Sequence, residues 1–435
     1  MYILYTIVLI LMGWLALPYL LWRSLKGAGY HRDWLERFGC GAAQQLAAQH
    51  APNGLLWFHA ASVGEVQGLQ PIIAELQQRF PALSVVCSTF TPTGKIMAKR
   101  LVPSAASVFL LPLDLPWVMG RLMRRLQPQA LIIQETELWP NCLRAAARQG
   151  VPVIVVNGRL SPRSAKRYRW IRRLMQQVLS DVTLIMAQTQ ESAQRFEALG
   201  AMAQRLKVVG NTNIDRALLA QPDLVVPHAL TLLTKGRRVW VGGSTHEGEE
   251  AMLLEAYRRV RQDHPEVLLV LAPRHLERVD AVVRQIQAAQ FRPVRRSAYD
   301  PKTADALTGD AVVILDTLGE LASLYGLCTI AFVGGSLVPI GGHNILEPAM
   351  FAKPMMFGPH MHHFPDLAHM FCVVGGAIQV ADTEALDRTV WRLLQHPDEA
   401  ELIGRRAYQT LQANRGALAA VVDDISRTLH RVTAA

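Results

Sequence analysis

The alternation of short apolar runs with longer amphipathic stretches constrains the fold of this chain more than any other feature. Apolar runs in the first half predict buried strands at residues 55–59, 83–87, 107–111, 130–134, 151–157, 182–186 and 205–209. Helical periods separate them, among them residues 65–79 and 139–148. Strands that alternate with helices in this way indicate a parallel sheet covered on both faces.

The same pattern starts again in the second half. Further strands are predicted at residues 239–242, 267–271, 311–315, 330–333 and 355–357, with helices at 249–263 and 320–325 between them. A chain of 435 residues also fits two domains. We therefore predict an α/β protein with two doubly wound, Rossmann-like lobes that face a cleft and bind ligands at the carboxyl ends of their strands.

The expected domain boundaries follow from these patterns. Residues 26–221 form the first lobe and residues 222–405 the second, and residues 222–236, which contain Pro222, Pro227 and Gly236, form a linker between them. Residues 406–435 are expected to form a C-terminal helix that can cross back to the first lobe.

The start of the chain predicts a membrane anchor at residues 1–25. Residues 2–22 contain no charged side chain and match the roughly 20 apolar residues of a spanning helix. Arg23, Lys26, Arg32 and Arg37 follow, which by the positive-inside rule places the lobes on the cytoplasmic side. Pro18 and the modest length leave open whether the helix spans the membrane or lies in its interface. A cleaved signal peptide fits less well, because the basic leading region is missing.

Charge and cysteine content limit the kinds of ligand and partner that this chain is expected to bind. The net charge of +10 suits phosphates on nucleotide, nucleic acid or anionic lipid. Five cysteines without a CxxC spacing argue against a disulfide framework and a structural zinc site. Arg121, Arg124 and Arg125, and the basic and aromatic residues 166–173, suit an anionic membrane surface, with a solvated helix face as the alternative. No nucleic-acid motif accompanies the charge, so no nucleic-acid partner is predicted.

Glu65 is the first candidate catalytic residue. It follows the first predicted strand in the sequence Ser62-Val63-Gly64-Glu65, where Gly64 allows close approach of a ligand and a carboxylate is suited to take a hydroxyl proton. The alternative is a capping box, in which Ser62 and Glu65 only satisfy amides at a helix N-terminus. The pattern by itself favours the cap.

Glu135 and Glu137 form the second candidate site. They come directly after the predicted strand 130–134, and paired carboxylates at a strand end raise each other's pKa and often act in catalysis or bind hydroxyls. The alternative is one solvated glutamate and one charge at the start of a helix, with Pro140 in its first turn.

Glycine-rich turns in the second half predict a phosphate site. Gly334, Gly335 and Ser336 follow the strand 330–333, and the sequence GGHNILEP at residues 341–348 opens a helix. Backbone amides backed by a helix dipole can hold phosphate, and Glu347 can reach ribose hydroxyls from one turn further on. Arg274 ends the strand 267–271, where a fixed guanidinium would complement phosphate, although structural surface arginines are common.

These motifs together resemble those of the 3-deoxy-D-manno-octulosonic acid (Kdo) transferases of lipopolysaccharide synthesis, which have a two-lobed GT-B fold. The resemblance runs from the anchor to the terminal helices. It rests on SVGE at 62–65, TPTG at 91–94, ETELWP at 135–140, STHEGEE at 244–250, PRH at 273–275, GGS at 334–336, and GHN at 342–344 with Glu347.

The resemblance implies an inverting transfer of Kdo from CMP-Kdo to a lipid A precursor at the inner membrane. Glu65 would be the general base, and Glu135 and Glu137 would support the acceptor or catalysis. The residues implied to hold CMP-Kdo are Arg274, Pro273, His275, Gly335, Ser336, Asn344, Glu347, Ser244 and Thr245. No metal or other cofactor is expected, and His360, His362 and His363 lack a carboxylate partner at ligand spacing.

One departure from the family pattern stands out. Relatives usually carry a lysine in a Gly-x-x-Lys-Phe-Asp stretch, whereas this chain has Asn213 there. The donor, the acceptor or the number of sugars added could therefore differ. Two other functions stay open at this point, a GT-B enzyme that uses a UDP-sugar and a non-enzymatic membrane scaffold.

Overall fold

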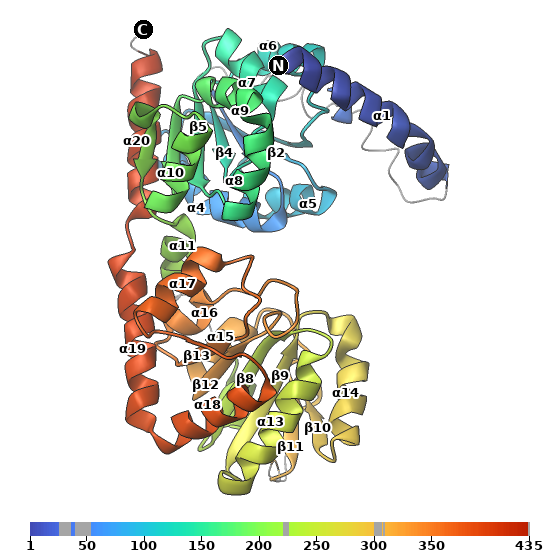
Figure 1. Cartoon of the computed structure of the whole chain (residues 1–435), viewed down its shortest axis with the longest axis vertical. Coiled ribbons are helices and arrows are strands. Elements are labelled where there is room, and N and C mark those ends of the chain that lie inside the picture. The colour runs from blue at the N-terminus through green and yellow to red at the C-terminus, as the bar shows by residue number, and fades with distance from the viewer. Residues whose placement is uncertain (26–35, 40–53, 221–225, 300–306, 308, 434–435) are drawn as a thin grey trace. The chain divides into compact units, whose positions relative to one another are not determined.

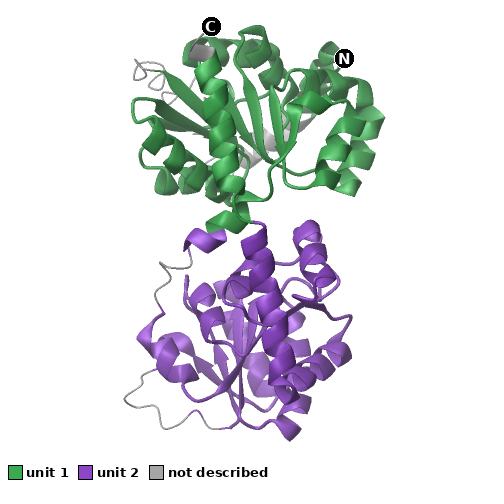
Figure 2. Cartoon of the chain, turned by 90° about the vertical axis from the view of Figure 1, so that its left-hand side faces the viewer, with its two compact units in different colours: residues 1–216, 415–435 green, residues 217–414 purple. Residues whose placement is uncertain are grey.

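The computed structural model describes residues 1–25, 36–39, 54–220, 226–299, 307 and 309–433. They form two compact units, residues 1–216 with 415–435, and residues 217–414, which Figure 2 colours separately. The first division lies five residues before the expected boundary after residue 221. The second lies within residues 406–435, which were expected to form one helix; the structure has one helix that ends at Ala413 and another that begins at Ala417.

Unit 1 contains a parallel sheet in the order β3-β2-β1-β4-β5-β6-β7. Its strands are β1 (Leu55–Ala60), β2 (Ser84–Thr89), β3 (Ser107–Leu110), β4 (Ala130–Gln134), β5 (Val153–Gly158), β6 (Leu184–Ala187) and β7 (Leu206–Val208). The chain builds outward from β1 in one direction and then returns to add β4 on the other side of β1. The carboxyl ends of β1 and β4 are therefore neighbours at the switch point of a doubly wound sheet.

Helices cover both faces of this sheet (Figure 1). Along β1, Leu55 and Trp57 belong to one buried cluster and Leu56 and Phe58 to another, as successive side chains on a strand require. The helices of unit 1 are α1 (Tyr2–Leu25), α4 (Val63–Arg79), α5 (Pro92–Leu101), α6 (Pro116–Leu126), α7 (Pro140–Arg148), α8 (Pro162–Tyr168), α9 (Arg172–Ser180), α10 (Gln190–Leu199), most of α11 (Thr212–Ala220) and α20 (Ala417–Thr433).

Unit 2 repeats the design with the order β10-β11-β9-β8-β12-β13-β14. Its strands are β8 (Arg238–Thr245), β9 (Val267–Pro273), β10 (Arg292–Arg295), β11 (Ala311–Ile314), β12 (Ile330–Val333), β13 (Met355–Phe357) and β14 (Ile378–Gln379). Its helices are α12 (His228–Thr234), α13 (Glu249–Asp263), α14 (Val279–Ala288), α15 (Leu321–Leu327), α16 (Leu346–Met350), α17 (Pro365–Val373), α18 (Thr383–Gln395) and α19 (Pro397–Ala413). The switch point here lies between β8 and β12.

The twelve predicted strands all correspond to strands of the two sheets, but three local expectations differ from the structure. The edge strands β10 and β14 were not predicted, because one begins and ends with arginine and the other is two residues long. The segment 222–236, expected as a linker, contains α12. The basic residues 166–173 do not form one helix, since a 3-10 turn at Arg169–Ile171 separates α8 from α9.

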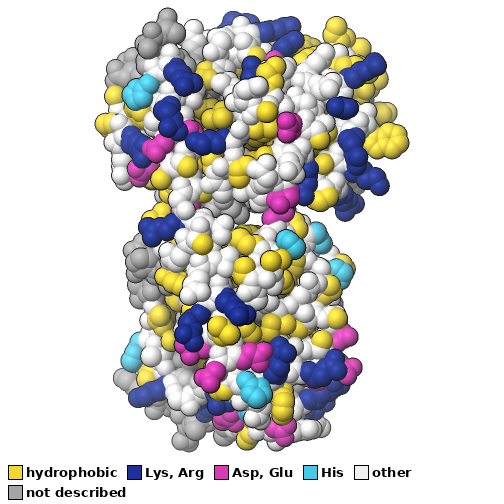
Figure 3. Space-filling model, turned by 60° about the vertical axis from the view of Figure 1, so that its left-hand side comes forward, with side chains coloured by type: hydrophobic (Ala, Val, Ile, Leu, Met, Phe, Trp, Pro, Cys, Tyr) yellow, Lys and Arg dark blue, Asp and Glu magenta, His cyan; other side chains and the backbone are white. Residues whose placement is uncertain are grey.

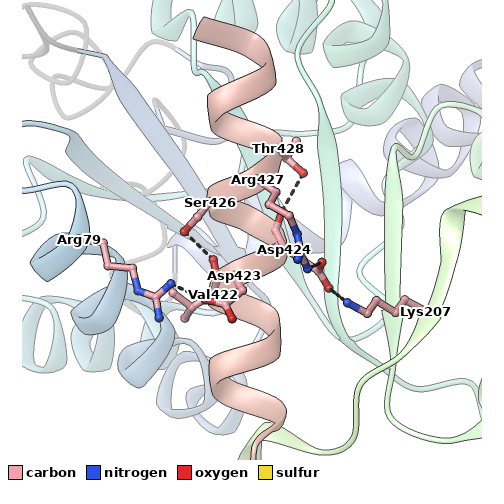
Figure 4. A network of polar contacts seen from close by, with 8 residues as sticks. All are labelled: Arg79, Lys207, Val422, Asp423, Asp424, Ser426, Arg427 and Thr428. Atoms are coloured by element: carbon pink, nitrogen blue, oxygen red, sulfur yellow. Dashed lines mark hydrogen bonds and ion pairs between the residues drawn. The ribbon is translucent and has the colours of Figure 1, made fainter. Parts of the chain in front are cut away.

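The C-terminal helix α20 packs on unit 1 through buried Val421, Val422, Ile425 and Leu429. Its N-terminus is tied down by the Asp215 carboxylate, which accepts hydrogen bonds from the amides of Gly416 (2.7 Å) and Leu418 (3.1 Å). Figure 4 shows the ion pairs along the helix, in which Arg79 contacts Asp423, and Lys207 and Arg427 contact Asp424.

Helix α1 docks on unit 1 through hydroxyl groups. Tyr2 donates to the Asp181 carboxylate at 2.5 Å, and Tyr5 donates to Asp114 at 3.0 Å. No helix among the described residues is both long enough and apolar enough to cross a membrane, so the predicted transmembrane span is not supported. Of the basic residues expected to follow an anchor, Arg37 instead donates to the backbone carbonyls of Leu111 and Phe90, and Lys26 and Arg32 lie outside the described residues.

Candidate functional site

In unit 1, Glu65 lies in the first turn of α4, directly after β1. Its carboxylate accepts hydrogen bonds from the Ala61 amide (2.8 Å) and the Ser62 hydroxyl (3.0 Å), and Ser62 in turn caps the helix. The neighbouring loop is fixed to the same turn, because the Thr91 amide and hydroxyl both donate to the Ala61 carbonyl at 3.1 Å. The contacts of a cap are therefore present around the candidate base.

The pKa of Glu65 differs from that of an ordinary capping carboxylate. Burial is the largest influence and raises the pKa of this carboxyl to about 8, assisted by the negative charges of Glu135 and Glu137 and opposed by the hydrogen bonds from Ala61 and Ser62. A carboxyl with this pKa is mainly protonated at neutral pH, and its ionised form is a stronger base than an ordinary carboxylate.

Glu135 and Glu137 lie at the carboxyl end of β4, beside β1. Desolvation raises the pKa of both, while Arg159 lowers that of Glu135 and the Trp139 indole, which donates to Glu137 at 3.1 Å, lowers that of Glu137. Their influence on the Glu65 pKa shows that the three carboxyls form one electrostatic group. The switch point of the sheet thus brings together the two candidate sites that are 70 residues apart in the sequence.

Left-handed backbone at non-glycine residues occurs near the carboxyl ends of β4, β5 and β8, and also at Gln127, Gln290 and Ala352. Glu135 (φ 59°) and Asn157 (φ 55°) in unit 1, and Ser244 (φ 55°) in unit 2, adopt the left-handed region without being glycine. Residues held in this region cluster at functional sites, where the surrounding structure maintains the strain.

In unit 2, Glu249 organises the glycine turn. This fully buried carboxylate accepts from the amides of His246 (3.0 Å), Gly335 (2.6 Å), Ser336 (2.9 Å) and Leu337 (3.0 Å). The amides of Gly335 and Ser336, expected to bind phosphate, are therefore already occupied by a protein carboxylate. The Ser336 hydroxyl is also internal, since it donates to the Val333 carbonyl and accepts from the Gly358 amide.

A second buried carboxylate, Glu250, holds the end of β8 to the next helix. It accepts from the Thr245 hydroxyl at 3.0 Å and from Arg278 at 2.8 and 3.1 Å. Thr245 is fully buried, so its hydroxyl supports the site rather than facing a ligand. Glu249 and Glu250 were not among the predicted site residues, although two adjacent acidic residues at the start of a predicted helix were a usable signal.

The remaining candidates of unit 2 surround this framework. Arg274 and His275 follow β9, and the exposed Arg274 side chain has no hydrogen bond or ion pair with any described residue. Pro273 ends β9 and is buried. Asn344 donates to Glu347 at 3.1 Å and accepts from the Leu346 amide, which fixes both side chains at the start of α16.

The loop histidines give no metal site within the described ranges. His362 and His363 contact each other edge to face with ring centroids 4.9 Å apart. Among the described residues, no group of three or more His, Cys, Asp or Glu side chains is placed to hold a metal ion. The four cysteines within the described ranges are free thiols, and Cys40 lies outside them.

Two doubly wound α/β units, each with its candidate residues next to the switch point, define a protein of the GT-B class. The UDP-GlcNAc 2-epimerase from Neisseria meningitidis bound to UDP-GlcNAc has a similar fold, with a TM-score of 0.62, 14% identity, and coverage of 86% of this chain and 100% of that chain. Similarity at this level of identity shows the fold alone.

Sequence comparison gives the family. Residues 32–216 match the family model described as 3-deoxy-D-manno-octulosonic-acid transferase (kdotransferase). The 3-deoxy-D-manno-octulosonic acid transferase of Haemophilus influenzae is 36% identical over 430 residues, 98% of each chain. That of Bordetella pertussis is 33% identical over 413 residues, 93% of this chain and 94% of that protein. The chain therefore belongs to the 3-deoxy-D-manno-octulosonic acid transferase family, which confirms the resemblance seen in the motifs.

Proposed function

We propose that this protein is an inverting glycosyltransferase that moves Kdo from CMP-Kdo to a lipid A precursor of the lipid IVA type in lipopolysaccharide core biosynthesis. Its membership of the family supports the reaction class. The observation that carries the mechanism is the placement of Glu65, a largely buried carboxyl with a raised pKa at the end of β1, next to Glu135 and Glu137.

In this mechanism ionised Glu65 takes the proton of a primary hydroxyl on the glucosamine disaccharide of the acceptor. The hydroxyl oxygen attacks the anomeric carbon of Kdo, and CMP leaves from the opposite side with the electron pair of the broken bond. Glu135 and Glu137 raise the basicity of Glu65 and can accept hydrogen bonds from acceptor hydroxyls. Ala61 and Ser62 hold the Glu65 carboxylate in a fixed orientation.

The donor is bound by unit 2 without a metal. The unpaired Arg274 guanidinium complements the phosphate charge of CMP, and the Asn344–Glu347 pair offers hydrogen bonds to the ribose. Gly335, Ser336 and Thr245 shape the site through Glu249 and Glu250 instead of contacting the nucleotide. Activity that survives prolonged chelation with EDTA is the expected result, and loss that Mg²⁺ restores would contradict it.

The protein acts at the cytoplasmic face of the inner membrane, to which α1 attaches in the interface. The tyrosine face of α1 docks on unit 1, while Ile3, Leu11, Trp14 and Leu15 are 57–82% exposed. Helices α1, α6 and α7 line a pocket of about 570 Å³ that includes Arg124 and Arg148. Figure 3 shows lysine and arginine side chains gathered along one margin of unit 1. Basic residues beside exposed apolar ones suit an anionic lipid surface.

Vesicle binding tests the attachment. Replacement of Leu11 and Trp14 by serine is expected to weaken sedimentation of the protein with vesicles that contain phosphatidylglycerol. Leu318→Ser, at a residue that is 84% exposed in unit 2, is the matched control and is expected to leave binding unchanged. Equal binding of all three proteins would contradict attachment through α1.

The reaction itself is tested with CMP-Kdo and a lipid A precursor, with product mass as the readout. CMP release that requires the acceptor, and a product heavier by one or more Kdo units, are expected. Greater thermal stabilisation by UDP than by CMP would favour a UDP-sugar donor, and absence of turnover with any sugar nucleotide would favour a scaffold. The number of mass increments also shows how many sugars a chain with Asn213 in place of the usual lysine adds.

A further inference from the structure

Two histidines of unit 2 share a hydrogen bond beside the glycine turn. The Nε2 atoms of His246, after β8, and His343, before α16, lie 2.8 Å apart. The ring planes differ by 4° and the ring centroids are 5.0 Å apart. The short nitrogen separation and the two ring radii account for that centroid distance, so the rings lie edge to edge in nearly one plane and not face to face.

This contact fixes how the protons of the pair are arranged. A hydrogen bond between two Nε2 atoms needs one protonated and one unprotonated nitrogen. In the neutral pair, therefore, one outer Nδ1 bears a proton and the other does not. Uptake of a single proton leaves the shared hydrogen bond intact and makes both Nδ1 atoms donors. The pair consequently titrates as one unit that changes from one outward donor to two.

The surroundings keep the pair in place and neutral in the free protein. Burial lowers the pKa of His343 to about 4, assisted by neighbouring positive groups, and burial also lowers the pKa of His246. Gly335 lies close to both rings, since a Cβ there would be 3.0 Å from Cδ2 of His343 and 3.4 Å from that of His246. The titratable and charged groups that act on the pair are His275, Arg274, Arg278, His363, Glu249 and Glu250.

Both rings are partly exposed, and neither Nδ1 has a hydrogen-bond partner among the described residues. Arg274, whose side chain is also unpaired there, is close enough to lower the pKa of His343. Two open imidazole nitrogens next to a free guanidinium are a site for an anion that accepts several hydrogen bonds. A phosphate group has this character.

We propose that His246 and His343 act as one proton-sharing unit that binds the phosphate of the nucleotide and takes up a single proton when the CMP dianion is bound. This proposal rests on the proposed function, because it takes the ligand of unit 2 to be a cytidine nucleotide. Arg274 supplies the permanent charge at the phosphate, and the histidine pair supplies the charge that is needed only after the donor has been cleaved.

The charge balance of the reaction explains this division. The phosphate of CMP-Kdo is a diester with one negative charge. When its bond to the anomeric carbon breaks, the electron pair passes to the phosphate oxygen, and CMP leaves with two negative charges. The acceptor proton goes to Glu65, and a proton from solvent goes to the histidine pair. Each negative phosphate charge in contact with a histidine raises its pKa by roughly 1 to 3 units. A bound dianion can therefore raise the pKa of the pair into the neutral range.

Calorimetry of CMP binding to the full-length protein at pH 7.5 tests the proposal. Titrations in buffers of different ionisation enthalpy give the number of protons taken up on binding. Free CMP is already mainly a dianion at this pH, so any proton taken up is assigned to the protein. We expect uptake approaching one proton with CMP and none with cytidine. The affinity for CMP should also increase as the pH falls from 8 to 6.5.

Variants separate the pair from other groups. His343→Asn and His246→Asn are each expected to weaken CMP binding roughly 10- to 100-fold, as loss of hydrogen bonds to a charged group does, and to abolish proton uptake. His369→Asn, at an exposed histidine of α17, is the matched control and should change neither quantity.

The outcomes are distinguishable. CMP binding by the wild-type protein without proton uptake, or with uptake that persists in both variants, would overturn the role of the pair and leave the transferase proposal standing. Failure of CMP to bind the wild-type protein would overturn both. The wild-type measurement decides the matter even if one variant does not fold.

Discussion

The substitution Glu65→Gln separates the two roles of this side chain. The glutamine oxygen can still accept from the Ala61 amide, and its amide group can donate to the Ser62 hydroxyl, so both capping contacts have a replacement. It cannot take a proton. We therefore expect turnover to fall by about 10²- to 10⁴-fold, the usual contribution of a general base, while the helix is retained.

The raised pKa of Glu65 also predicts that the Glu65→Gln variant is more stable than the wild-type protein. The folded pKa of about 8 exceeds the ordinary value of 4.5, so the folded state holds the proton more tightly and stability is lost as the pH rises from about 4.5 to about 8. At pH 7 the upper limit of this loss is about 3 kcal/mol, at about 1.4 kcal/mol per pH unit. Because Glu65 is partly exposed, screening reduces it, and we expect Glu65→Gln to gain about 1 kcal/mol.

Two measurements check this reasoning. Hydrogen exchange of the α4 amides, corrected for intrinsic rates, should show that Glu65→Gln resists opening more than the wild-type protein at pH 8 and equally at pH 4. The wild-type kcat/KM should rise with pH up to an inflection near 8, since only ionised Glu65 is a base. Glu75→Gln, on the exposed face of the same helix, is the control. Near-normal turnover of Glu65→Gln, or a variant less stable than the wild type at pH 8, would refute the assignment.

Three other substitutions test the framework around the sites. Glu249→Gln replaces one acceptor oxygen, leaves at least one buried amide without a partner, and should lower stability by about 1–3 kcal/mol and weaken CMP binding, whereas exposed Glu247→Gln should do neither. Asp215→Ala removes the cap of α20 and should lower the free energy of unfolding by about 1–2 kcal/mol. Hydrogen exchange should become faster in α20 and stay unchanged in α4. Tyr5→Phe removes the hydroxyl that donates to the Asp114 carboxylate and should speed hydrogen exchange in α1; unchanged α1 exchange would show that this hydrogen bond does not anchor the helix.

The positions of most strands along the chain and the loops that carry the candidates could be predicted, because both follow from local patterns. Apolar runs marked twelve of the fourteen strands in the two described sheets, and the expectation that ligands bind at the carboxyl ends of parallel strands pointed to the turns after β1, β4, β8, β9 and β12. The edge strands β10 and β14 were not predicted, because one begins and ends with arginine and the other is two residues long. The helix α12 was not predicted, because the prolines and the glycine of its segment indicated a linker.

The partners of individual groups could not be predicted, since they come from residues far apart in the chain. The amides of Gly335 and Ser336 are satisfied by Glu249, 86 and 87 residues earlier. The Tyr2 and Tyr5 hydroxyls donate hydrogen bonds to Asp181 and Asp114. The helix in this apparently uniform apolar segment therefore has a polar face that contacts the rest of unit 1. Periodicity reports which face is apolar, but it does not report such distant acceptors.

Glu65, the proposed general base, and Glu249 differ in how completely their carboxylates are satisfied by hydrogen bonds. Each lies in the first turn of the helix after the first strand of its sheet, and each accepts from backbone at that turn. Glu249 accepts from four amides and is fully buried, so its two oxygens have no capacity left for a ligand. Glu65 has one amide and one hydroxyl, remains partly exposed, and lies beside two other carboxyls that oppose its ionisation. A carboxylate in the first turn of such a helix thus holds the neighbouring turns in place when its hydrogen bonds are complete, and it becomes suited to proton transfer when they are not.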